Sequence, residues 1–303
     1  MSREQRQALD ELLRHAPLDI GGDVAEQRAV FHEMIAAVPV ASDVTFIPGE
    51  LGGVPVVTVG TPDHDPSLVV LYIHGGAYAI GSASDSVGLA ADVARRTGAR
   101  AVSVDYRLAP EHPFPAAVDD TLAVYHALLK DGVPSTRIAV VGESAGGGLA
   151  VATLLAARDA GLPQPSSAVL FSPWTDLTVS GASAVGKADV DPALTAEGLR
   201  TRARDYLGTA DPAAPLASPV FADLTGLAPL LIQVGSHEIL LDDAVRLAAR
   251  AGAHDVAVQL QVWPEVPHVF QSFAAFLTDA SEALDSAAAF ATARWAESAA
   301  PLP

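Results

Sequence analysis

The sequence predicts an α/β fold in which helices cover both faces of a mostly parallel, eight-stranded sheet. Strand-length runs rich in Val, Ile and Leu alternate along the chain with helical stretches. Several of these runs are apolar along their whole length, which is typical of parallel strands buried on both faces. Two longer segments fall outside the alternation, and they predict an additional helical layer.

Eight runs are bounded by turn residues and are expected to be the strands. They are Val44–Ile47, Val54–Val59, Leu68–His74, Ala99–Tyr106, Ile138–Gly142, Ala168–Ser172, Leu230–Gly235 and Val256–Trp263. The first two lie close together, with Gly49, Gly52 and Gly53 between them. This spacing predicts an antiparallel hairpin at one edge of the sheet.

Helical stretches follow most of the later runs. They cover about Asp85–Thr97, Ala116–Lys130, Ala145–Ala160, Ile239–Ala251 and Val269–Ser298. A strand followed by a helix, repeated several times, favours a doubly wound sheet with right-handed crossovers.

Residues 1–43 and 174–227 do not fit the alternation. The first segment looks helical and amphipathic, and the second combines Pro, Gly and Ala-rich turns with a helical stretch near Thr195–Leu207. A connection as long as the second is rarely bare loop. We interpret the two segments as parts of one cap over a catalytic core formed by 44–173 and 228–303. The alternative is a pair of unrelated surface excursions.

The composition excludes several classes of partner. The chain has 303 residues and a net charge of −18, so it is expected to bind neither nucleic acid nor anionic membranes. It contains no Cys, and its nine His show no metal-ligand spacing. The sequence also lacks a dinucleotide-binding fingerprint. No metal or cofactor is therefore expected. The N-terminus lacks an apolar signal segment, and no run is long enough to span a bilayer. We therefore expect a cytoplasmic protein.

A candidate nucleophile lies in the pentapeptide Gly142-Glu143-Ser144-Ala145-Gly146. It matches G-x-S-x-G, follows the apolar run that begins at Ile138, and precedes a helix rich in small residues. This strand–turn–helix setting is the one in which the motif presents a serine on a strained turn. The two glycines leave space for that turn. The alternative is a plain Gly-rich connection.

The segment His74-Gly75-Gly76-Ala77 closes the third run and supplies a candidate oxyanion hole. Paired glycines allow backbone N–H groups to point at a bound oxygen. With the N–H of Ala145, the N–H groups of Gly75 and Gly76 would stabilise a tetrahedral oxyanion. His74 itself is expected to order this loop.

A base and an acid are expected after Ser144 in the chain, in the order Ser, Asp or Glu, His. His268 follows the last strand, whereas His237 and His254 precede it, so His268 is the candidate base. Glu238, three residues past the seventh strand, is the favoured acid. Asp242 and Asp243 are the alternatives, although both are expected in the first turn of the next helix.

Four segments together resemble the bacterial hormone-sensitive-lipase-like esterases, known as family IV, of the α/β-hydrolase superfamily. They are HGGAYAIGS at 74–82, DYRLAPEHPFPAAVDD at 105–120, GESAGGGLA at 142–150, and EILLDD…PH at 238–268. The resemblance implies an α/β-hydrolase fold and a carboxylesterase that acts on short-chain esters without a cofactor. It implies Ser144 as nucleophile, His268 as base, and Gly75, Gly76 and Ala145 as oxyanion hole. The sequence departs from the family at Glu238-Ile239, where many members have Asp-Pro.

Other inferences follow from the same resemblance. The substrate is expected to be a small ester, with lactone hydrolysis or acetyl-ester deacetylation as alternatives on the same triad. A ligand receptor is disfavoured because Ser144 and His268 are both present. The last strand, as a sheet edge, suggests a homodimer. Arg107 is expected to pair with Glu143 or Asp105, and Tyr78 and Trp174 are candidates for the acyl pocket or for core packing.

Overall fold

The computed structural model describes residues 2–36 and 40–299, and contains one mixed sheet with the strand order β1-β2-β4-β3-β5-β6-β7-β8. The strands are β1 (Thr45–Leu51), β2 (Val54–Gly60), β3 (Asp65–Ile73), β4 (Ala99–Val104), β5 (Ile138–Glu143), β6 (Ser167–Phe171), β7 (Leu230–Gly235) and β8 (Val258–Trp263). β1 pairs antiparallel with β2, and β2 with β4, whereas all later neighbours are parallel.

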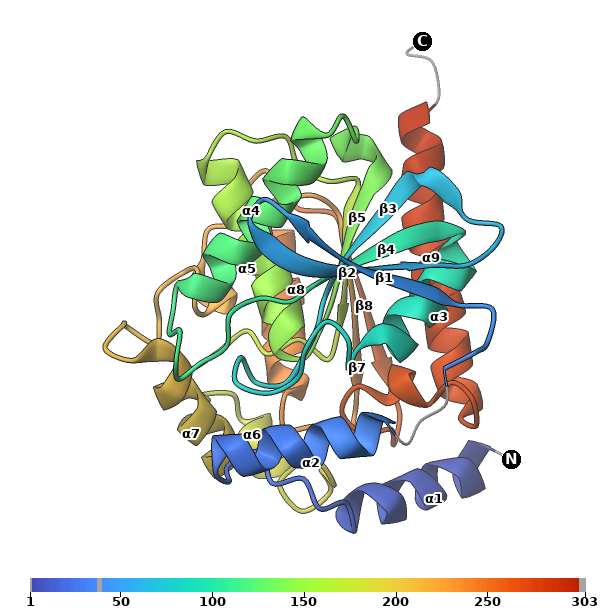
Figure 1. Cartoon of the computed structure of the whole chain (residues 1–303). Helices are drawn as coiled ribbons and strands as arrows, with labels where there is room; N and C mark the ends of the chain where they lie inside the picture. Colours follow the sequence, from blue (N-terminus) through green and yellow to red (C-terminus); the bar gives the residue numbers. More distant parts are fainter. Residues whose placement is uncertain (1, 37–39, 300–303) are drawn as a thin grey trace.

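Helices cover both faces of this sheet (Figure 1). The helices are α1 (Ser2–Arg14), α2 (Val24–Ala36), α3 (Val87–Thr97), α4 (Ala116–Lys130), α5 (Ala145–Asp159), α6 (Ser183–Gly186), α7 (Ala196–Leu207), α8 (Leu241–Ala253) and α9 (Thr278–Ala299). α4, α5 and α8 lie on one face, and α3 and α9 lie on the other. The predicted α/β class and the eight strands are confirmed.

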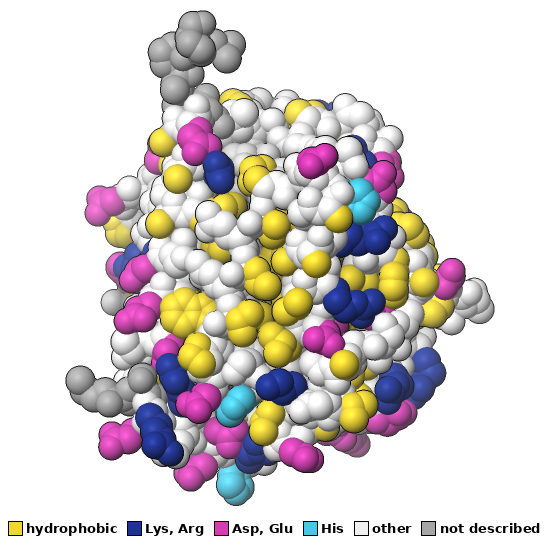
Figure 2. Space-filling model, turned by 180° about the vertical axis from the view of Figure 1, so that it is seen from behind, with side chains coloured by type: hydrophobic (Ala, Val, Ile, Leu, Met, Phe, Trp, Pro, Cys, Tyr) yellow, Lys and Arg dark blue, Asp and Glu magenta, His cyan; other side chains and the backbone are white. Residues whose placement is uncertain are grey.

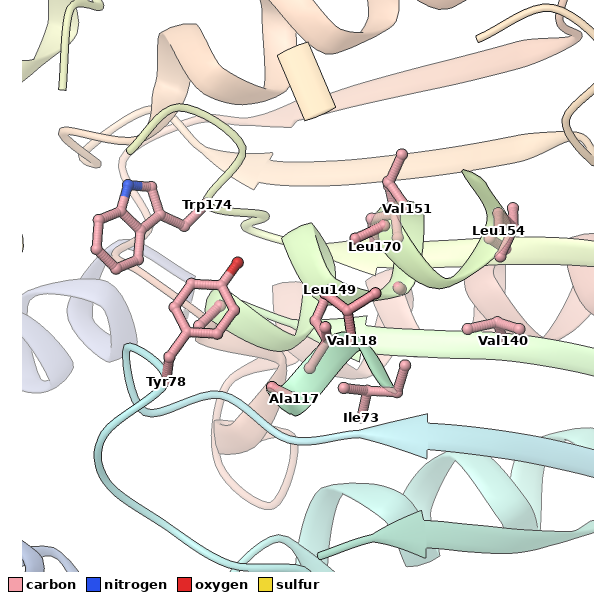
Figure 3. Packing of buried hydrophobic residues seen from close by; sticks show 14 of the residues in the cluster. Ile73, Tyr78, Ala117, Val118, Val140, Leu149, Val151, Leu154, Leu170 and Trp174 are labelled. Carbon is pink, nitrogen blue, oxygen red and sulfur yellow. The ribbon is translucent and has the colours of Figure 1, made fainter. Parts of the chain in front are cut away.

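Burial on both faces is clearest in β3. Leu71 and Ile73 belong to the apolar cluster beneath α4, α5 and α8, while Val70 and Tyr72 belong to the cluster beneath α3 and α9. Alternate side chains of one strand thus enter two separate cores, because neighbouring side chains in a strand point to opposite faces. Figure 3 shows Ile73, with residues of β5 and β6, packed against α5.

Most elements begin or end within three residues of their predicted bounds, and two differ by more. β1 runs on to Leu51, because a turn at Gly52 and Gly53, both with positive φ, pairs it with β2 along its whole length. The helix expected from Val269 begins only at Thr278, after a short 3₁₀ turn at Phe270–Phe273. Val269 has φ 49°, a left-handed conformation that an α-helix cannot contain.

The two segments outside the alternation touch each other at one end of the molecule (Figure 1). The Arg202 guanidinium of α7 donates to the carbonyl oxygen of Gly22 (3.0 Å), and Arg14 of α1 donates to the carbonyl oxygen of Val190 (3.3 Å). Residues 1, 37–39 and 300–303, which the expected boundaries include, lie outside the described residues. Of the helices that are described, none is both long and apolar enough to cross a membrane.

Candidate active site

Ser144 occupies a strained turn between β5 and α5. Its φ of 53° and ψ of −122° lie outside the regions that residues with a Cβ ordinarily adopt. The turn requires glycine on both sides: a Cβ on Gly142 would lie 2.2 Å from the Gly146 carbonyl oxygen, and a Cβ on Gly146 would lie 2.1 Å from the Ile73 carbonyl oxygen. The space that the sequence predicted at Gly142 and Gly146 is therefore a steric requirement.

Three expected side chains meet at the carboxyl ends of the parallel strands. The Ser144 hydroxyl lies 2.8 Å from His268 Nε2, and His268 Nδ1 lies 2.8 Å from Glu238 Oε2. Glu238 is fully buried, and the His268 side chain is 9% exposed. A hydroxyl, an imidazole and a carboxylate in this order can pass the hydroxyl proton to the imidazole and stabilise the resulting imidazolium.

The structure brings Glu238, rather than Asp242 or Asp243, against His268. Asp242 and Asp243 lie in the first turn of α8 and have other partners. The Asp242 carboxylate accepts a hydrogen bond from the Ser183 backbone N–H, and Asp243 accepts from Thr175 and Asp176. Burial raises the pKa of Asp243 to about 8.

Ser172, at the end of β6, is a site residue that the sequence analysis missed. Its hydroxyl donates to Glu238 Oε1 (2.7 Å) and accepts from the backbone N–H of Val269 (3.1 Å), next to His268. Glu238 Oε1 also accepts from the Gly235 N–H. A serine at the end of the strand between the elbow strand and the acid strand is the signal that could have identified it.

Three carboxylates contribute negative charge at His268. Burial lowers the pKa of His268, but the hydrogen bond and the charge of Glu238 raise it, and so do the charges of Asp191 and Glu143; the net pKa is raised. The Glu143 carboxyl is itself buried and its pKa is raised by that burial, although the Tyr72 hydroxyl donates to it (2.9 Å). The site thus favours a positively charged imidazole.

The loop after β3 approaches Ser144 closely. A Cβ on Gly75 would lie 3.1 Å from the Ser144 Cβ, and a Cβ on Gly76, whose φ is 99°, would lie 2.0 Å from the Ile80 carbonyl oxygen. The N–H of Gly75 faces the Glu143 carboxyl and lowers its pKa. Ala145 is the first residue of α5, where the backbone N–H has no partner within the helix.

His74 orders this loop, as expected. Its ring stacks on Tyr106 at a centroid distance of 4.1 Å, and its Nδ1 lies 2.7 Å from the carbonyl oxygen of Gly75. Burial lowers the pKa of His74, which favours the neutral ring. The Tyr106 hydroxyl donates to the His74 carbonyl oxygen (2.9 Å), so that ring and backbone are fixed together.

The predicted partner of Arg107 differs from the one in the structure. Arg107 pairs with Asp120 of α4 (2.8 Å), and not with Glu143 or Asp105. The Asp105 side chain instead accepts from the Ala83 N–H, and Glu143 is turned towards Tyr72. The pairing was wrong because the partner of Arg107 comes from the following helix.

Tyr78 and Trp174 are packed in the interior. Their side chains are at most 2% exposed, and Tyr78 stacks on Tyr206 of α7 with a centroid distance of 3.9 Å. Figure 3 shows Tyr78 and Trp174 side by side at one end of α5.

Across residues 2–36 and 40–299, no three His, Asp or Glu side chains are grouped so that they could hold a metal ion.

Comparison with known proteins places these features in a family. Residues 70–272 match the family described as the alpha/beta hydrolase fold. An acetyl-hydrolase of Streptomyces hygroscopicus is 44% identical over 251 residues, which cover 80% of this chain and 84% of the relative. A carboxylesterase of Mycobacterium tuberculosis is 36% identical over 225 residues, covering 71% and 70%.

Solved structures agree with these relatives. The crystal structure of an esterase from the bacterial hormone-sensitive lipase family has a TM-score of 0.93 and 40% identity, and the match covers 96% of this chain and 98% of that one. The esterase EstE5, whose crystal was soaked with p-nitrophenyl butyrate, has a TM-score of 0.92 and 37% identity, covering 96% and 99%.

Proposed function

The chain belongs to the bacterial hormone-sensitive-lipase-like family of α/β hydrolases and is a carboxylic ester hydrolase, and we propose that Ser144, His268 and Glu238 are its catalytic triad. Ser144 is the nucleophile, His268 is the general base and then the general acid, and Glu238 fixes the imidazole tautomer. The observation that carries the proposal is the pair of 2.8 Å hydrogen bonds that joins these side chains at a strained serine.

The proposed reaction has two halves. Ser144 Oγ attacks the ester carbonyl carbon while His268 Nε2 takes the hydroxyl proton. The bond to the alcohol oxygen then breaks, and His268 returns the proton to the leaving alcohol, which leaves an acyl-enzyme on Ser144. In the second half, water attacks the acyl carbon and gives a proton to His268. The carboxylic acid departs as Ser144 regains that proton.

The oxyanion formed in each half needs backbone donors. Of the residues expected in this role, the proposal keeps Gly76 and Ala145. It takes Ala77 in the place of Gly75, because the N–H of Gly75 faces the Glu143 carboxyl. The Ala145 donor lies at the N-terminus of α5, where the helix dipole adds to the stabilisation of negative charge.

Short-chain esters are the proposed substrates. Tyr78, Trp174 and Tyr206 form a buried group of large rings at one end of α5, the helix that begins next to Ser144. The backbone N–H of Trp174 donates to the Ser144 carbonyl oxygen (2.9 Å), so the main chain joins this aromatic group to the serine turn. Deacetylation of acetyl esters is a second candidate, favoured by the relative that is an acetyl-hydrolase.

The proposal includes the cap and the assembly. Residues 1–43 and 174–227 would form the cap, which is supported by their mutual contacts through Arg202 and Arg14.

A homodimer would form along β8, the edge strand, where Leu260 and Val262 are 37% and 45% exposed. Seen from behind, the molecule carries apolar side chains gathered on one face (Figure 2). A cytoplasmic location completes the proposal and is open to cell fractionation.

Hydrolysis of p-nitrophenyl esters from acetate to palmitate tests this function. We expect the highest kcat/KM with acetate or butyrate, and a loss of about 10⁶-fold in kcat for Ser144→Ala. A maximum at long acyl chains would contradict the substrate proposal, and an active Ser144→Ala variant would contradict the triad. Comparison with an acetylated sugar or alcohol of similar size would distinguish deacetylation from general esterase activity.

A further inference from the structure

Asp191 is a buried carboxylate with an unusual set of partners. It lies between α6 and α7 and is only 6% exposed. Its Oδ1 accepts hydrogen bonds from the backbone N–H groups of Ala193 and Leu194, both at 2.9 Å. Its Oδ2 accepts from the backbone N–H of Ile239 at 2.8 Å. Both oxygens are therefore used, and they join two segments that are 48 residues apart in the chain.

The hydrogen bond from Ile239 connects Asp191 to the main chain of the proposed acid. Ile239 follows Glu238, so Asp191 holds the peptide group that links these two residues. The carboxylate of Glu238 is fixed on its other side by Ser172 and the Gly235 N–H. Main chain and side chain of the acid are thus restrained from different elements. The restraint on the main chain comes from the 174–227 segment and not from the sheet.

Asp191 also contributes charge to the site. The negative charges that face His268 come from Glu238, Asp191 and Glu143, in the order of their effect on its pKa. The charges that face Asp191 are those of His268 and of Arg14 in α1, whose guanidinium also donates to the carbonyl oxygens of Asp189 and Val190. Burial raises the pKa of Asp191, whereas its three N–H donors favour the charged form.

We infer that Asp191 is a positioning residue for the triad: it holds the Glu238 loop through the Ile239 N–H and places a second negative charge beside His268. The inference rests on the proposed triad. When His268 takes the proton of Ser144 it becomes a cation in a site that excludes water, and a fixed carboxylate nearby stabilises that cation. The cap segment would then take part in the electrostatics of the reaction.

Two variants separate the two roles. Asp191→Asn keeps the shape of the side chain and removes its charge. Asp191→Glu keeps the charge, but its extra methylene displaces the carboxylate oxygens from the Ile239 N–H. Thr195→Ala is the matched control, because it removes a capping hydrogen bond to the Gly198 N–H (3.1 Å) in the same segment and touches neither Glu238 nor His268.

The readout is kcat and KM for p-nitrophenyl butyrate as a function of pH, with thermal melting of each variant. We expect kcat to fall by about tenfold to a hundredfold in Asp191→Asn and in Asp191→Glu, with little change in KM, because misplacement of the acid slows the chemical step. In Asp191→Asn the acid limb of kcat/KM should move to lower pH, since a charge that raises the pKa of His268 is gone. In Asp191→Glu, which keeps the charge, the acid limb should stay at the wild-type pH.

An acid limb that does not move in folded Asp191→Asn would overturn the electrostatic role. Wild-type kcat in both variants, or losses no larger than in Thr195→Ala, would overturn the positioning role. Ser144→Ala, measured alongside, distinguishes the failures: if it retains activity, the proposed triad itself is wrong. If it is inactive while both Asp191→Asn and Asp191→Glu behave like wild type, only the inference about Asp191 fails.

Discussion

The serine turn and the acid loop lie at the same edge of the sheet, but they are held in different ways. The turn at Ser144 is fixed by steric limits within five residues, where Gly142 and Gly146 leave no space for a Cβ. The loop at Glu238 is fixed by hydrogen bonds with remote residues: Ser172, directly after β6, and Asp191 of the 174–227 segment. The proposed nucleophile is thus positioned locally, and the proposed acid is positioned by the tertiary structure.

This difference predicts how each region responds to mutation. A change in the serine turn must disturb backbone, because the nearest atoms are carbonyl oxygens of β3 and α5. A change around Glu238 removes one hydrogen bond of several and leaves the chain path intact. We expect mutations in the serine turn to abolish activity, and mutations around Glu238 to reduce activity by graded amounts.

Gly146→Ala should have the largest effect, because its Cβ would lie 2.1 Å from the Ile73 carbonyl oxygen and 2.4 Å from that of His74. We expect esterase activity to be abolished and the free energy of unfolding to fall by about 3 kcal/mol. Gly88→Ala is the control, since a Cβ there would meet nothing within 4 Å. In this variant the free energy of unfolding should rise by about 0.5 kcal/mol or more, because alanine favours the helix α3 over glycine. Denaturant unfolding and a p-nitrophenyl acetate assay measure both. An active Gly146→Ala enzyme would show that the turn is not sterically fixed.

Glu238→Gln should reduce kcat by about 10⁴-fold with little change in stability, because the amide no longer holds the productive imidazole tautomer. Asp242→Asn serves as the control: it lies four residues further along and contacts Ser183 instead of His268. We expect the control to stay within about threefold of wild type in kcat. Steady-state kinetics would contradict the assignment of the acid if Asp242→Asn lost more activity than Glu238→Gln.

Ser172→Ala should cause an intermediate loss. Glu238 Oε1 would keep only its bond from Gly235, and the buried Val269 N–H would lose its partner, at a cost of about 1–3 kcal/mol in unfolding free energy. We expect kcat to fall about tenfold or more. Ser103→Ala removes a buried hydroxyl that bonds to Ala83 away from the triad, and it should leave kcat unchanged. Equal kcat values for the two variants would mean that Ser172 has only a structural role.

The pH dependence of the wild-type enzyme should be the smallest effect. His268 accepts a proton only when neutral, so kcat/KM should fall as the pH decreases through its pKa, and this limb should lie above the ordinary value of 6.5. The same raised pKa stabilises the folded state below the unfolded pKa, and that contribution is lost as the pH rises through the folded one. A limb below 6.5 would show that the surrounding carboxylates do not outweigh burial.

The same contrast explains what could be predicted from the sequence. The strands, the serine turn and the oxyanion loop depend on local patterns, such as apolar runs and paired glycines, which can be read directly. His268 and Glu238 could be proposed because parallel strands bring their carboxyl ends to one edge. Ser172 could have been identified only by its place directly after β6, whereas Asp191 could not, since it acts through backbone N–H groups that any residue except proline supplies. The partner of Arg107 was missed for another reason, because only the packing of α4 brings Asp120 near it.

The central claim is that Ser144 is a nucleophile activated by His268, and covalent labelling tests it most directly. The enzyme would be treated with diethyl p-nitrophenyl phosphate, and the labelled residue and labelling rate would be determined by mass spectrometry. We predict one diethylphosphoryl group on Ser144 in wild type, slower labelling of Ser144 in Glu238→Gln, and almost none in His268→Ala. A label on another residue, or equal rates in all three proteins, would contradict the account.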